Sequence, residues 1–90
     1  MLRGLVRADF SLIRNGADQM RDTSLHAELA SVHDDAVYQH FSAEFRRLAN
    51  KLSRMAEQEH LDGAAYAFQN LTTTCIACHQ HVRDSISLAD

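Results

Sequence analysis

Two cysteines and a histidine lie close together near the end of the chain, in the segment Cys75-Ile-Ala-Cys78-His79. The spacing Cys-x-x-Cys-His is an attachment signal for a c-type haem, whose iron takes a histidine as axial ligand. Positions three and four apart are neighbours on a helix, with Cβ atoms about 5–6 Å apart, so the three side chains share one face. The motif therefore predicts one covalently attached haem c, held by Cys75 and Cys78, with His79 as the metal ligand.

Three other uses of this cysteine pair stay open as alternatives. Cysteines on an apolar face can pack as small hydrophobic side chains. A structural zinc site needs four protein ligands, but the remaining histidines are scattered and supply no obvious second pair. A redox-active pair prefers a helix N-terminus that follows a strand, whereas about three helical turns are expected before Cys75. The haem interpretation is favoured over all three.

The other histidines carry no comparable signal. His81 comes two positions after His79 and points well away from it on a helix, which excludes it as the opposite ligand of the same iron. The remaining ones are expected on solvated or half-buried faces: His26, His33, His40 and His60.

Helical periodicity extends over almost the whole sequence, with no alternating, strand-like run. We therefore predict an all-α fold, an antiparallel bundle of three long helices plus one short helix in a single domain, residues 1–90. The first long helix should cover about residues 2–21, and the short one about 24–32, beginning near Ser24. Asp34 and Asp35 are expected to cap the next long helix, and Asp62 the last.

Each long helix has an apolar face at spacings of three and four, which is expected to pack in the core. The three sets are Leu2, Leu5, Val6, Phe10, Ile13, Ala17 and Met20; Tyr38, Phe41, Phe45, Leu48, Leu52 and Met55; and Ala65, Phe68, Leu71, Cys75, Cys78, Val82 and Ile86.

Two local features bear on how the helices pack. Gly16 weakens the first helix by up to about 1 kcal/mol relative to alanine, so it is either a tolerated defect or a point of close approach by a helix or a haem edge. Thr72, Thr73 and Thr74 form a run of poor helix formers just before the motif, and their hydroxyls are expected to bond to preceding carbonyls.

Composition excludes several classes of function. With 90 residues and a net charge of −3, the chain has no basic stripe that would indicate a nucleic-acid partner. The first ten residues contain charges and lack the apolar core of a signal peptide or membrane span. No phosphate-binding loop or catalytic triad is present, so we do not expect an enzyme. Haem attachment at such a motif takes place outside the cytoplasm, so we expect a periplasmic or otherwise exported protein whose leader is absent from this chain.

The segment from Leu71 to Arg83 resembles the class II c-type cytochromes, especially the cytochrome c′ family, which carry the motif near the C-terminus on the final helix of a bundle. Val82 stands where that family usually has Tyr or Phe. The resemblance implies His79 as proximal ligand, Arg83 near the haem propionates and a distal side formed by the first helix. It also implies binding of a small diatomic such as nitric oxide.

The distal residues follow from the direction of the helices. If the first and last helices run antiparallel, Phe10 and Ile13 should face the iron opposite His79. Neither can ligate, and Met20 lies too far along the helix to be the expected partner. We therefore expect a five-coordinate or readily opened iron.

Two functions of different classes follow from the sequence. The first is a haem protein for electron transfer, for binding of small diatomic gases, or for both, with an unknown redox partner. The second is a haem-free helical interaction or dimerisation domain. We also expect a homodimer, because a shortened second helix would leave apolar residues such as Leu25 and Leu29 uncovered.

Overall fold

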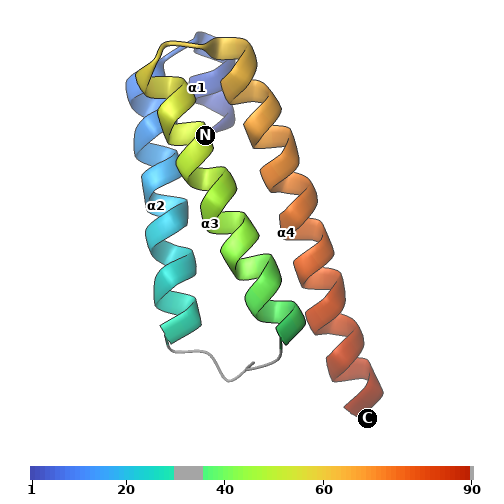
Figure 1. Ribbon diagram of the computed structural model, residues 1–90. Coiled ribbons are helices and arrows are strands. Elements are labelled where there is room, and N and C mark those ends of the chain that lie inside the picture. The colour runs from blue at the N-terminus through green and yellow to red at the C-terminus, as the bar shows by residue number, and fades with distance from the viewer. Residues whose placement is uncertain (30–35, 90) are drawn as a thin grey trace.

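The computed structural model describes residues 1–29 and 36–89, and within these it contains four helices and no strand (Figure 1). The helices are α1 (Leu2–Arg7), α2 (Phe10–Leu29), α3 (Ala36–Glu57) and α4 (Leu61–Ala89). The prediction of an all-α bundle of three long helices plus one short helix is confirmed. The expected caps Asp34 and Asp35 lie outside the described residues.

The short helix is the first one, and this corrects the expected helix boundaries. The helix expected over residues 2–21 is interrupted at Ala8, which adopts the left-handed conformation with φ 53°. Asp9 then caps α2, because its carboxylate accepts a hydrogen bond from the backbone N–H of Leu12 at 3.1 Å. Ser24 starts no helix of its own but lies inside α2.

The break at Ala8 also changes which apolar residues are buried. Leu2 and Val6 were expected in the core, but their exposed fractions are 64% and 78%. Because α1 turns back from α2 at the break, it cannot continue the apolar stripe of that helix. Ile13 and Ala17 of α2 are fully buried as expected.

The three long helices alternate in direction, so α2 and α4 both run antiparallel to α3 and therefore parallel to each other (Figure 1). Both pack against α3, while α1 packs against one end of α2 and of α4. Helix α1 thus occupies the position of a fourth bundle helix, but only over six residues.

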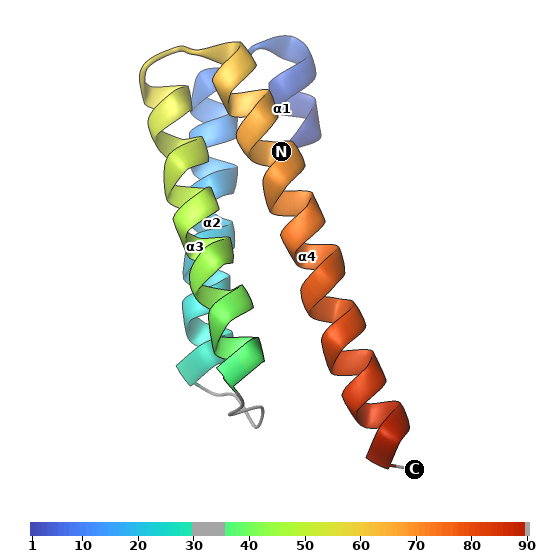
Figure 2. The same cartoon turned by 45° about the vertical axis from the view of Figure 1, so that its right-hand side comes forward.

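The core is concentrated near the end of the bundle where α1 lies. Alanines make up more than half of its buried residues and let the helices approach closely. Towards its C-terminus α4 diverges from α2 and α3, as Figure 2 shows. The buried apolar residues are Ile13, Ala17, Leu48, Ala49, Leu52, Ala56, Ala64, Ala67 and Leu71.

Helix α4 begins with a histidine cap instead of the expected aspartate cap. The Nδ1 atom of His60 accepts a hydrogen bond from the backbone N–H of Gly63 at 2.8 Å. Asp62 instead lies in the first turn, where a negative charge interacts favourably with the helix dipole. Sequence preference favoured Asp62, but the turn that reverses the chain at Glu59, with φ 55°, places His60 at the cap position.

Candidate cofactor-binding cavity

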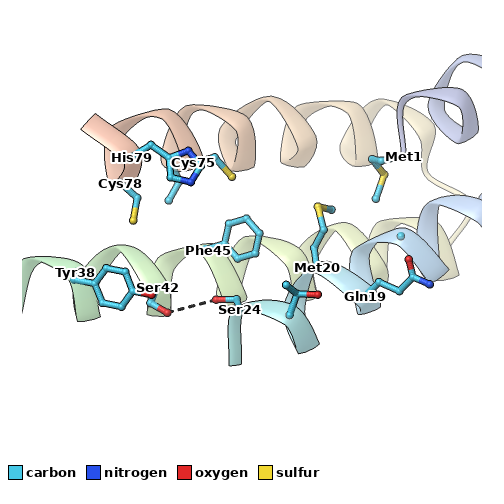
Figure 3. A pocket seen from close by; sticks show the side chains of 13 residues that line it. Met1, Gln19, Met20, Ser24, Tyr38, Ser42, Phe45, Cys75, Cys78 and His79 are labelled. Atoms are coloured by element: carbon cyan, nitrogen blue, oxygen red, sulfur yellow. Dashed lines mark hydrogen bonds between the residues drawn. The ribbon is translucent and has the colours of Figure 1, made fainter. Parts of the chain in front are cut away.

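A cavity of about 550 Å³ lies between the helices at the diverging end of the bundle, and Figure 3 shows its walls. This volume falls in the range of about 300–1,000 Å³ that is typical of small-molecule and cofactor sites. All three residues of the Cys-x-x-Cys-His motif line it. The full set is Met1, Gly16, Gln19, Met20, Thr23, Ser24, Tyr38, Ser42, Phe45, Thr74, Cys75, Cys78 and His79.

The short first helix explains why the cavity lies where it does. Helix α1 contacts α2 and α4 at one end of the bundle only, and Met1 at its start lies on the cavity wall. Among the described residues, the backbones of α2 and α4 do not contact each other. The space between these two helices, above α3, is therefore left for the cavity.

The motif projects from α4 into this space. Cys75 is half-buried and packs against the core, Cys78 is also half-buried, and His79 is exposed beside them. Figure 3 shows the side chains of Cys75, Cys78 and His79 along one wall of the cavity. Burial raises the pKa of the Cys75 thiol, and the neighbouring Cys78 raises it further. Cys75 is thus held as a neutral thiol at neutral pH.

The threonine run before the motif is satisfied within its own helix, as predicted. The hydroxyls of Thr72, Thr73 and Thr74 donate to the carbonyls four residues earlier, at 3.0, 3.1 and 3.0 Å. Thr74 lines the cavity, but its hydroxyl proton is already donated to the Asn70 carbonyl. The cavity wall next to Cys75 therefore offers no hydroxyl proton from this run.

The walls facing the motif are formed by residues other than those expected. Phe10 and Ile13 do not line the cavity; Ile13 is fully buried in the core and Phe10 packs against it. Met20 was expected to lie too far along its helix, yet it lines the cavity together with Met1 and Phe45. The reason is the direction of the helices: α2 and α4 are parallel, whereas the expectation assumed antiparallel helices.

The register of the parallel helices accounts for the new neighbours. Helices α2 and α4 begin at the same end of the bundle, at Phe10 and Leu61 (Figure 1). The distance along the chain is fourteen residues both from Leu61 to Cys75 and from Phe10 to Ser24. Because each residue advances a helix by about 1.5 Å, Ser24 lies at the level of Cys75. Residues near Phe10 lie several helical turns away from the level of Cys75.

One end of the cavity is polar. Ser42 of α3 is only 6% exposed, and its hydroxyl lies 3.4 Å from that of Ser24. Nη1 of Arg46 donates to the Ser42 oxygen at 2.9 Å. Tyr38 lies beside these hydroxyls at the end of the cavity that Cys78 lines (Figure 3). Sequence reasoning missed this group, although Ser42 and Arg46 are four residues apart on one helix face.

The remaining expected site residue, Arg83, does not line the cavity. Its side chain is exposed, and its Nε lies 3.7 Å from a carboxylate oxygen of Asp84. The ring of His81 packs against Phe41, with 6.3 Å between ring centroids, which agrees with its expected direction away from His79.

The described residues contain no group of three or more His, Cys, Asp or Glu side chains arranged to hold a metal ion. None of the described helices combines the length and hydropathy needed to cross a membrane.

Comparison with models of protein families, with curated proteins and with solved structures found no match. The resemblance to the cytochrome c′ family therefore depends on the residues of the final helix alone.

Proposed function

We propose that this protein binds one c-type haem, attached through Cys75 and Cys78, with His79 as an axial ligand of the iron. The observation that carries the proposal is that all three residues of the motif line one cavity of cofactor size. A cysteine pair that only filled the core would not need an adjacent cavity or an exposed histidine on the same wall. The donor set also fits: two thiols for the porphyrin edge and one imidazole for iron.

The two cysteines would form the covalent bonds. Each cysteine would hold the porphyrin through one thioether, formed by adding its S–H across a vinyl group, with the sulfur on one vinyl carbon and the hydrogen on the other. No oxidant is required for this addition. The raised pKa of Cys75 keeps its proton in place before the reaction. His79 is held on the same helix face, one residue after Cys78, so it is positioned once both thioethers have formed.

The bound haem would supply one-electron redox chemistry and a position for small ligands at its iron. We propose electron transfer, binding of small diatomic gases such as nitric oxide, or both, in a periplasmic or otherwise exported setting with a redox partner protein. Met1, Met20 and Phe45 give the cavity an apolar region. Because burying an unpaired charge there is costly, uncharged diatomics are favoured over anions in that region.

Met20 is a candidate ligand for the sixth coordination position of the iron. Its thioether is a side chain that can ligate haem iron, unlike Phe10 or Ile13, and it lies on the cavity wall. The proposal of an open iron predicts that carbon monoxide binds the reduced protein readily and that Met20→Leu leaves the spectrum unchanged. A six-coordinate spectrum that Met20→Leu abolishes would make simple electron transfer the better account.

Haem staining after denaturing electrophoresis tests the attachment directly. Protein produced with haem-maturation machinery should retain haem, and the double variant Cys75→Ser, Cys78→Ser should lose it. His79→Ala should change the iron spectrum, whereas the matched change His81→Ala should leave it the same, because His81 does not line the cavity. Undiminished staining of the double variant would overturn the proposal.

The second candidate is a haem-free helical interaction or dimerisation domain. It is favoured by exposed apolar side chains, among them Leu2, Val6 and Leu25, whose exposed fractions are 64%, 78% and 45%. Leu29 is also expected in such a contact, but its side chain lies outside the described part of the structure. Absorption spectra of protein made with and without haem-maturation machinery separate the two candidates, and sedimentation at low micromolar concentration tests the homodimer.

A further inference from the structure

The polar end of the cavity is built around one buried hydroxyl. Ser42 is 6% exposed and is the buried polar residue of the described chain. Its oxygen accepts a hydrogen bond from Nη1 of Arg46 at 2.9 Å and lies 3.4 Å from the hydroxyl oxygen of Ser24. Both serines line the cavity, whereas Arg46 does not line it and lies four residues after Ser42 on the same helix.

The hydrogen bonds within this group leave a donor for a ligand. Each serine has one hydroxyl hydrogen, and the guanidinium of Arg46 has donors only. The single contact between Ser24 and Ser42 uses at most one of the two hydroxyl hydrogens. The other remains to be donated at the cavity wall. Because Nη1 of Arg46 donates to the Ser42 oxygen, this charge-assisted hydrogen bond polarises the hydroxyl towards an acceptor that is negatively charged.

We propose that Ser42 and Ser24, with Arg46 as the positioning charge, bind a carboxylate group of the cavity's ligand. If the ligand is haem, this group is one of its two propionates, so the inference rests on the proposed function. The resemblance to cytochromes c′ implied Arg83 for that role. Arg83 is exposed and lies beside Asp84, outside the cavity wall, so the charge comes from α3 instead of from the end of α4.

This arrangement gives the ligand a defined orientation. The motif fixes the porphyrin edge on α4, and the serines lie on α2 and α3, across the cavity from it (Figure 3). A carboxylate bound at this pair of hydroxyls would therefore join all three long helices through the ligand. Charge-assisted hydrogen bonds are roughly twice as strong as neutral ones, so the carboxylate should contribute measurably to affinity.

The test compares two ligands that differ only in their carboxylates. In the full-length variant Cys75→Ser, Cys78→Ser, binding is reversible, so affinities can be measured by spectrophotometric titration with ferric haem and with its dimethyl ester. We expect haem to bind about tenfold or more tightly than the ester. Adding Ser42→Ala or Arg46→Gln should reduce this preference to near unity.

Matched controls lie on the same helix. Ser53 donates to a carboxylate oxygen of Asp18 at 3.0 Å, and Arg47 pairs with Glu44, but neither residue lines the cavity. Ser53→Ala and Arg47→Gln should therefore keep the preference for haem over its ester, and circular dichroism checks that every variant is folded.

The possible outcomes separate this inference from the proposed function. Equal binding of haem and ester, with binding still dependent on His79, overturns the carboxylate site and leaves the haem proposal standing. Failure of both ligands to bind, together with no covalent haem in the unsubstituted protein, overturns the proposed function itself. A preference for haem that persists in both Ser42→Ala and Arg46→Gln also refutes the assignment, because the carboxylate would then be bound elsewhere.

Discussion

Two glycines in helices should respond in opposite ways to the same substitution. A Cβ atom added at Gly16 would lie 2.8 Å from Cε of Met1, the far end of a flexible side chain that can move into the cavity. A Cβ atom added at Gly4 would lie 3.0 Å from Cγ1 and 3.2 Å from the backbone nitrogen of Ile13. Ile13 is fully buried and its backbone belongs to α2, so it cannot move without disturbing the core.

The expected free energies follow from these contacts. Alanine is more favourable than glycine inside a helix by about 1 kcal/mol, so Gly16→Ala should raise the free energy of unfolding by about 0.5–1 kcal/mol. At Gly4 the same gain is opposed by overpacking, which costs typically about 1–3 kcal/mol. Gly4→Ala should therefore lower the free energy of unfolding, and the two variants should melt at least about 4 °C apart.

Urea unfolding of the haem-free protein, followed by far-ultraviolet circular dichroism, measures both values. If Gly4→Ala is as stable as Gly16→Ala or more so, then α1 does not pack on Ile13 as described. Gly16→Leu extends the test to the cavity, since a larger side chain there occupies part of the space and should reduce the covalent haem incorporation that we propose. Asn15→Leu adds the same side chain at a neighbouring exposed position and should leave incorporation unchanged.

Substitutions at three further positions test other parts of the structure. His60→Ala should lower stability by about 1 kcal/mol by removing the acceptor for the Gly63 N–H, whereas His60→Asn, a good capping residue, should not. In the haem-free protein the raised pKa of Cys75 means that the folded state holds this thiol proton more tightly than the unfolded chain does. The resulting contribution to the free energy of unfolding is complete at neutral pH and is lost as pH rises through the raised pKa. Unfolding measurements over a series of pH values should show this alkaline loss in the unsubstituted protein and not in Cys75→Ser. Leu52→Ala should cost about 2–5 kcal/mol because this side chain is fully buried, and a loss below about 0.5 kcal/mol would contradict its place in the core.

Sequence periodicity was sufficient where a helix has one uninterrupted apolar face. In α3 the spacing of three and four continues through Phe45, Leu48, Leu52 and Met55, and these residues are buried or pack against the core. The final helix was also predicted, together with a face that includes Leu71 and Cys75. Near the start of α4 the fully buried residues are Ala64 and Ala67 and not the expected Ala65, and their spacing of three and four residues leads on to Leu71.

Periodicity failed where a single residue leaves the helical conformation. Alanine is the strongest helix former, and a left-handed alanine costs roughly 1–2 kcal/mol, so nothing at Ala8 itself indicates a break. The usable signal was Asp9, an acceptable cap three residues before Leu12. Thr23 and Ser24 resembled a cap equally well, yet they continue inside α2, where Ser24 contacts Ser42 of α3.

The position of that one break decides which residues face the motif. A break after residue 21 would put three chain reversals between the helix that carries Phe10 and the helix that carries Cys75, which makes the two antiparallel. The actual break at Ala8 leaves two reversals, so α2 and α4 are parallel and Ser24 lies level with Cys75. The cavity wall opposite the motif is consequently formed by thioethers and hydroxyls, from Met20 to Ser24, instead of by Phe10 and Ile13. The wall that faces the motif therefore carries side chains that can ligate iron or bind a carboxylate, which Phe10 and Ile13 cannot do. This difference in chemistry follows from the backbone conformation of Ala8, which lies just before the start of α2.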